Sequence, residues 1–247
     1  MGHQFQTEMF DIKVPYTTSP QMTRATGPLF TLSNTYTFRK SVELELWKTD
    51  LYGTIDDNAK DLVRKACSLC NVEETDNIVK FAMNFEEDVA ILHKGVLSAI
   101  CFCFPSSWVP RERIGMSLSK IHSEVADGQR LVDYSQKIAE VMCKQSFERF
   151  VWTICNSNSL SQHPKSKSNH VPQTIDDLYF RTEKQTTMPL DEESSLFFVH
   201  VSVYPLNAVF QDKETKQKII DSVNSMSDNV LKYKNLVKIK EVLTKIL

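Results

Sequence analysis

Residues 87–104 read EDVAILHKGVLSAICFCF, and this stretch decides the fold. It contains two apolar, β-prone runs, 87–92 and 96–104, each of a length typical of strands. Between them stands His93-Lys94-Gly95, a short connection whose glycine suits a tight turn. We therefore predict a β-hairpin whose second strand ends at Phe104-Pro105, because proline has no N–H to donate to a neighbouring strand.

A helix and three further strands are predicted after the hairpin. The helix has one apolar face, formed by Leu131, Tyr134, Ile138, Val141 and Met142. The strands are expected at 149–155, 178–186 and 196–204, and the last alternates apolar residues at 197, 199, 201 and 203. Two strands, a helical crossover and three strands predict an α+β, PAS-like fold, in which helices cover one face of an antiparallel sheet and enclose a ligand pocket.

The flanking segments extend this domain. Residues 1–55 begin with a stretch rich in Pro, Gly, Ser and Thr, so we expect an irregular lead-in. The PAS-like domain then spans 56–210, starting with an amphipathic helix capped at Asp56-Asp57. Residues 157–172 are polar and read as a surface loop that could act as a lid. Two amphipathic helices within 211–247 pack on the domain; their apolar residues are Ile219, Ile220, Val223 and Met226, then Leu236, Val237, Ile239, Val242, Leu243 and Ile246.

The composition describes an ordinary globular protein. The 247 residues are 41% hydrophobic and 24% charged, with a formal net charge of -2, so neither a nucleic acid nor an anionic membrane is indicated as a partner. No run approaches the roughly 20 apolar residues that a membrane span needs, and the first residues lack a signal-peptide layout, so a cytoplasmic location is expected. The six cysteines mostly lie in apolar segments and are expected to be reduced.

An ordered series of motifs begins where the hairpin ends. Residues 104–115 read FPSSWVPRERIG and are followed by Ile121-His122. Further along stand Asn156, Gln162-His163-Pro164, Arg181-Thr182-Glu183-Lys184-Gln185-Thr186, Pro205-Leu206 and Tyr233-Lys234. Over roughly residues 80 to 236 this series resembles the haem-dependent oxidative N-demethylase family, whose members typically show Phe-Pro-x-x-Trp-x-Pro-x-x-Lys-x-Gly and then Ile-His.

The resemblance implies a PAS-like subunit that holds haem b and oxidises a methyl group of a small secondary amine such as dimethylamine. In that family the reaction uses O₂ and electrons from NADPH, delivered through a flavin and iron–sulfur reductase. The present sequence has neither a glycine-rich dinucleotide fingerprint nor the four-cysteine spacing of an iron–sulfur cluster. A separate reductase, as protein or subunit, is therefore the expected partner.

The resemblance also singles out candidate site residues. His122 is the expected iron ligand, since a neutral imidazole binds haem iron well. Arg181 would contact a haem propionate and Trp108 the haem, although Trp108 could equally anchor packing. Asn156 and Gln185 are the expected catalytic residues of the pocket. Arg181, Glu183 and Gln185 alternate along one strand and should share a face, and Tyr233 and Lys234 could close the pocket.

The sequence departs from the family pattern near these residues. Ser123 follows the histidine where relatives have Pro-Val-Pro, and Ser157 replaces a tryptophan. His200 stands where an arginine is common, on the opposite strand face from Val199 and Val201. If that face lines the pocket, His200 is a cofactor contact or second iron ligand; if it faces water, it is inert. Two functions therefore remain open: a demethylase, or a non-catalytic haem or small-ligand sensor.

Overall fold

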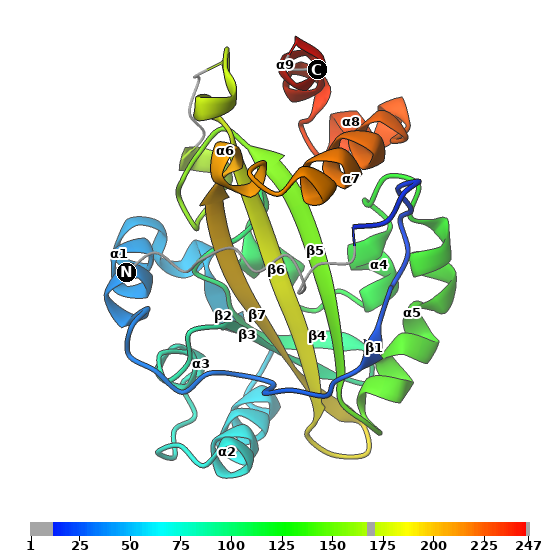
Figure 1. Cartoon of the computed structure of the whole chain (residues 1–247). Helices are drawn as coiled ribbons and strands as arrows, with labels where there is room; N and C mark the ends of the chain where they lie inside the picture. Colours follow the sequence, from blue (N-terminus) through cyan, green and yellow to red (C-terminus); the bar gives the residue numbers. More distant parts are fainter. Residues whose placement is uncertain (1–11, 167–170, 246–247) are drawn as a thin grey trace.

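Over its described residues the protein is an α+β chain built around one open antiparallel sheet of seven strands; in Figure 1 β5, β6 and β7 lie in front and β2, β3 and β4 behind them. This computed structural model describes residues 12–166 and 171–245. The strand order is β1-β5-β6-β7-β3-β4-β2. The strands are β1 (Thr23–Arg24), β2 (Tyr52–Thr54), β3 (Asp88–His93), β4 (Val96–Cys101), β5 (Phe147–Cys155), β6 (Tyr179–Pro189) and β7 (Ser194–Pro205).

The predicted hairpin is confirmed as β3 and β4. Val89 pairs with Cys101 and His93 with Val96, leaving a two-residue turn. Lys94 and Gly95 occupy it with φ of 52° and 74°, the left-handed values that the twist of a two-residue hairpin requires. Gly95 adopts such a φ without steric cost, so the local sequence sets the turn and the register of the pairs next to it; between Ile91 and Leu92 the register then shifts.

Helices surround the sheet on its sides and ends (Figure 1). Between β4 and β5 the chain crosses through α4 (Leu118–His122) and α5 (Gln129–Met142), which pack closely together. Elsewhere lie α1 (Thr37–Trp47), α2 (Asn58–Cys70), α3 (Ile78–Ala82), α6 (Leu206–Val209), α7 (Lys213–Asn224), α8 (Asp228–Tyr233) and α9 (Val237–Lys245). Short 3₁₀ turns occur at Lys48–Asp50, Pro110–Arg113, Pro164–Ser166 and Ile175–Asp177.

Two apolar cores hold these elements. The first joins α2 and α3 to β3, β4 and β7, with Phe81, Phe85 and Phe198 fully buried. The second packs α7, α8 and α9 against the ends of β5 and β6 through Trp152, Ile154 and Phe180 among others. Figure 1 accordingly shows α6 to α9 gathered at one end of the sheet and α2 with α3 at the other. The predicted C-terminal helices thus complete a core rather than extend from the domain.

The expectation of an irregular stretch over 1–55 is wrong for its described part, because it includes helix α1. Its apolar residues Phe38, Val42 and Leu46 recur at the four-residue spacing of a helix, but all three side chains are exposed. The buried residue of α1 is instead Lys40, whose Nζ donates to Ala82 O and Phe85 O at 3.0 and 2.9 Å and to Glu87 O. Three carbonyl acceptors make this burial of an ammonium group tolerable.

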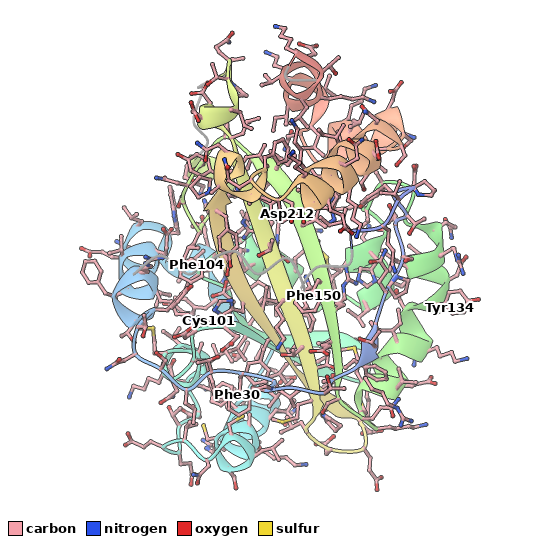
Figure 2. All side chains as sticks on the ribbon, viewed as in Figure 1. Phe30, Cys101, Phe104, Tyr134, Phe150 and Asp212 are labelled. Carbon is pink, nitrogen blue, oxygen red and sulfur yellow. The ribbon has the colours of Figure 1, made fainter. Side chains whose placement is uncertain are left out.

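Two other expectations need correction or lie beyond the described chain. Tyr134 does not belong to the inner face of α5: it is 49% exposed and points away from the sheet in Figure 2, while Leu131, Ser135, Ala139 and Met142 are buried. The face of α5 that packs on the core is therefore shifted by one residue from the predicted one. Ile246 and residues 167–170 of the predicted loop lie outside the described residues.

No helix within the described ranges is long and apolar enough to cross a membrane.

Candidate functional site

A cavity of about 1150 Å³ lies against one face of the sheet. Its apolar wall comes from β3, β4, β7 and the crossover helices, including Leu92, Phe102, Phe197, Leu131 and Met142. Residues from the segments 13–22 and 232–239 also line it. Typical pockets for small ligands measure roughly 300–1,000 Å³, so this cavity has room for a large cofactor together with a small substrate.

The polar floor of the cavity is the middle of β6. Arg181, Glu183 and Gln185 all line it, which confirms that the three alternating side chains share one face. Register extends this face to both neighbouring strands: β5 places Thr153, Val151 and Arg149 opposite them, and β7 places Val203, Val201 and Val199. Antiparallel pairing puts directly opposed side chains on the same side of a sheet, so this face spans three strands, with polar side chains from β5 and β6 and valines from β7.

Glu183 is the hub of a hydrogen-bonded cluster. Its Oε1 accepts from Arg181 Nη1 at 2.6 Å and from the Ser106 hydroxyl, and its Oε2 accepts from Gln185 Nε2 at 2.7 Å. Burial alone would raise the pKa of Glu183, but the Arg181 charge and these hydrogen bonds outweigh it and leave the pKa lowered. The cavity therefore holds a carboxylate that stays ionised at neutral pH.

Arg181 is already heavily engaged. It is 2% exposed, and besides the Glu183 contact its Nη2 donates to Phe104 O at 2.8 Å and Leu160 O at 3.3 Å. Its Nε has no partner. Arg181 thus ties the carboxylate to the backbone around the family-like Phe104-Pro105 motif. The predicted propionate contact would have to be made by Nε and by the one N–H of Nη1 that is left over.

His122 ends α4 and lines the cavity. Its Nδ1 lies 3.1 Å from Ser135 Oγ, and that hydroxyl donates its own proton to Leu131 O at 2.5 Å. Ser135 must therefore accept from Nδ1–H, which leaves the lone pair of Nε2 free. Burial, helped by the charge of Arg149, lowers the pKa of His122 to about 4, so the ring is neutral at physiological pH. A neutral imidazole with its other nitrogen held by a partner is the form that binds a metal.

His163 is a second histidine of the cavity lining, and its tautomer is different. Its Nδ1 accepts from Lys165 N at 3.3 Å, so the proton resides on Nε2, which faces Asp50 Oδ2 at 3.5 Å. The ring is also stacked on Trp47, with centroids 4.3 Å apart. His163 therefore offers no free lone pair, and of these two rings only His122 is prepared to bind a metal.

Three other predicted residues have contrasting positions. Asn156 lies at the end of β5 in the cavity lining. Trp108 also lines the cavity, and its ring packs edge-on against Phe102 with centroids 5.5 Å apart, so packing and a cofactor contact are compatible there. His200 does not line the cavity: its ring lies beside Tyr36, and its Nε2 is 3.3 Å from Glu86 Oε2. It occupies the opposite face of β7, so the geometry gives no support to His200 as a cofactor contact or second iron ligand.

Arg149 is the cavity residue that sequence reasoning did not single out. It stands opposite Gln185 on β5, and its pKa is lowered by burial against the opposing effect of Glu183. Alternation along β5 puts Arg149, Val151 and Thr153 on one face of the strand, but the sequence does not show which face of β5 meets the cavity. Tyr233 and Lys234, expected to close the pocket, do line the cavity.

The fold and the cavity together define a class: an α+β protein with a cofactor-sized cavity between a sheet and its crossover helices. The family model described as "Haem-dependent oxidative N-demethylase, alpha subunit-like" matches residues 32–244. The chain belongs to this family. Among curated proteins, none matches the sequence.

The residues of the cavity fit a haem. His122 presents an unprotonated nitrogen from a position within the lining, and the apolar walls of β3, β4 and α5 suit a flat hydrophobic macrocycle. Among the residues that the structure describes, seven lysine and arginine side chains line the cavity against three glutamates, although the whole chain has a net charge of -2. A positive cavity in an acidic chain suits a cofactor that carries carboxylates.

Proposed function

We propose that this chain is a haem-dependent oxidative N-demethylase subunit that removes a methyl group from a small amine such as dimethylamine. The observation that carries the proposal is the free Nε2 of His122, held toward a cavity of about 1150 Å³ by the Ser135 hydroxyl. The proposed cofactor is haem b, with His122 as its iron ligand. When bound, the haem supplies the oxygen chemistry that oxidises the N-methyl group.

The strand order supports a PAS-like description of the domain. Its five central strands follow the order β5-β6-β7-β3-β4, and the crossover from β4 to β5 passes through α4 and α5. This places the first two strands beside the last, which is the arrangement expected from two strands, a helical crossover and three strands. The short strands β1 and β2 add to the two edges.

The carboxylate of Glu183 is the proposed binding partner of the substrate. A secondary alkylamine is protonated at neutral pH, and an ionised carboxylate in a cavity of low polarity binds an ammonium group strongly. Arg181 and Ser106 occupy Oε1, while Oε2 accepts one hydrogen bond, from Gln185, and has a lone pair to spare. Gln185 and Asn156 would orient the amine, and Phe102 and Phe197 would exclude water around its methyl groups.

A partner must supply the electrons. The family description names an alpha subunit, and the sequence has no dinucleotide fingerprint or iron–sulfur spacing of its own. We propose an NADPH-dependent flavin and iron–sulfur reductase as that partner, either a subunit or a separate protein.

The test is the visible spectrum of the protein reconstituted with haem. We expect a Soret band that His122→Ala abolishes or shifts and that His93→Ala leaves unchanged. His93 is a matched control, because its Nδ1 also pairs with a serine hydroxyl, that of Ser194 at 2.9 Å, but it does not line the cavity. An unchanged spectrum in His122→Ala would reject the ligand assignment.

Catalysis is tested separately from haem binding. With dithionite or a surrogate reductase, dimethylamine should perturb the spectrum and release formaldehyde in the presence of O₂. Glu183→Gln should weaken amine binding while the Soret band of the ligand-free protein stays in place. A haem protein that ignores amines would instead be a sensor.

A further inference from the structure

Arg149 carries a charge that the described protein does not neutralise. Its side chain lies in the cavity lining, its Nε is buried without a hydrogen-bond partner, and the guanidinium forms no hydrogen bond or ion pair with any described residue. The side chain as a whole is partly buried, and a partly buried charge without a partner lowers the stability of the fold. Such a cost is tolerated where a ligand later supplies the missing charge.

In the described part of the chain, the carboxylate that acts on Arg149 is that of Glu183, and it is not available as a partner. Glu183 acts on Arg149 through the electrostatic field alone, because its two oxygens already accept from Arg181, Ser106 and Gln185. Arg181 balances its single negative charge. One arginine on this face of the sheet is therefore left in excess.

Lys234 is a second cation of the cavity, and its hydrogen-bonding capacity is only partly used. It follows α8 and lines the same cavity, where its Nζ donates to Trp152 O at 2.9 Å and lies 5.6 Å from the centre of the Tyr16 ring. An ammonium group has three donors, so this one hydrogen bond leaves capacity for a ligand. Burial, opposed by the charge of Glu183 and helped by that of Arg149, lowers the pKa of Lys234 to about 8. The two cations are near enough to repel each other.

We propose that Arg149 and Lys234 form the anchor for the carboxylate groups of the porphyrin, a role that the sequence suggested for Arg181. The inference rests on the proposed function, since it takes the haem as the ligand. Arg149 can offer its guanidinium fork to a carboxylate, whereas both Nη groups of Arg181 are held by Glu183, Phe104 and Leu160. His122 and this anchor then hold different parts of the cofactor: the iron and the acidic edge.

The closing experiment measures binding of iron-free protoporphyrin IX and of its dimethyl ester by quenching of tryptophan fluorescence. Without iron, His122 contributes no coordination bond, so the comparison reports on the carboxylates. We expect the free diacid to bind at least about tenfold more tightly than the diester, as a charge-assisted contact implies. Arg149→Met and Lys234→Met should each remove most of that difference, and Arg149→Lys should keep part of it.

Lys184→Met is the matched control. The substitution removes one positive charge from β6, but Lys184 does not line the cavity. The preference for the diacid should therefore stay intact in this variant. The melting temperature of the ligand-free protein shows whether a variant is folded. Arg149→Met should raise this temperature, because it deletes a partly buried charge that has no partner, while it weakens porphyrin binding. A residue with a merely structural role would not separate these two effects.

The outcomes distinguish the anchor from the haem proposal itself. Equal affinity for diacid and diester in the wild-type protein, with haem still bound through His122, would overturn the anchor alone. A preference for the diacid that survives in both Arg149→Met and Lys234→Met would also overturn it. If neither porphyrin binds and no Soret band forms with haem, both proposals fall together.

Discussion

Replacement of Arg181 by methionine should destabilise the protein more than the same replacement of Lys184 on the opposite face of the same strand. The substitution removes the cation that holds Glu183 ionised while leaving that carboxylate buried. It also deprives Phe104 O and Leu160 O of their donor. Breaking one side of a buried ion pair typically costs about 3–5 kcal/mol. Ser106 and Gln185 still donate to Glu183, so we expect the lower part of that range, about 3 kcal/mol.

The measurement is urea unfolding at pH 7, followed by tryptophan fluorescence. Lys184→Met provides the control, since its ion pair with Glu148 is 3.8 Å long and the two side chains are 25% and 17% exposed. We expect it to cost less than about 1 kcal/mol. The loss of unfolding free energy in the double variant Arg181→Met with Glu183→Met should be about 1–3 kcal/mol smaller than the sum of the losses in the two single variants, because no uncompensated charge then remains.

A pH signature accompanies the loss of stability. In the wild-type protein the pKa of Glu183 is lowered, so its ionisation stabilises the fold above the ordinary carboxyl pKa, and this contribution disappears as the pH falls through the folded value. Without Arg181 the burial effect dominates and the pKa should rise above its ordinary value, so acidification should then favour the fold. Additive effects of the two methionine substitutions, or an Arg181→Met cost below about 1 kcal/mol, would refute the reasoning.

Two further predictions concern other buried groups. Since the pKa of His122 falls from 6.5 to about 4 on folding, the unfolded chain takes up a proton first, and the ligand-free protein should lose about 3 kcal/mol as the pH drops from about 6.5 to 4. His122→Gln should remove this component from unfolding curves recorded across that range, and an unaltered pH profile would show that His122 is not buried neutral. Lys40→Met should cost at least about 2 kcal/mol in urea unfolding, because it leaves the buried carbonyls of Ala82, Phe85 and Glu87 without their donor. A neutral effect would mean that methionine packing compensates fully.

Much of the fold was predictable because its signals are local. The hairpin of β3 and β4 follows from two apolar runs and a turn glycine, and the alternation of Arg181, Glu183 and Gln185 onto one face follows from strand geometry. Strand periodicity depends on the backbone alone, so it holds wherever the strand lies. The motif series that resembles the demethylase family can also be recognised from the order of residues alone, and the family match over residues 32–244 agrees with it.

Partners, in contrast, were decided by the tertiary structure. Helix α1 turns Lys40 inward and Phe38 outward because the carbonyl ends of a distant segment, 82–87, offer acceptors there. Arg181 and Arg149 lie on the same face of adjacent strands. Only the fold pairs Glu183 with Arg181 and leaves Arg149 without a hydrogen-bond partner among the described residues. The sequence by itself determined which residue types could form a site. The packing of elements far apart in the chain determined which lone pairs and charges remained free for a ligand, because hydrogen bonding and burial depend on neighbours that no local pattern specifies.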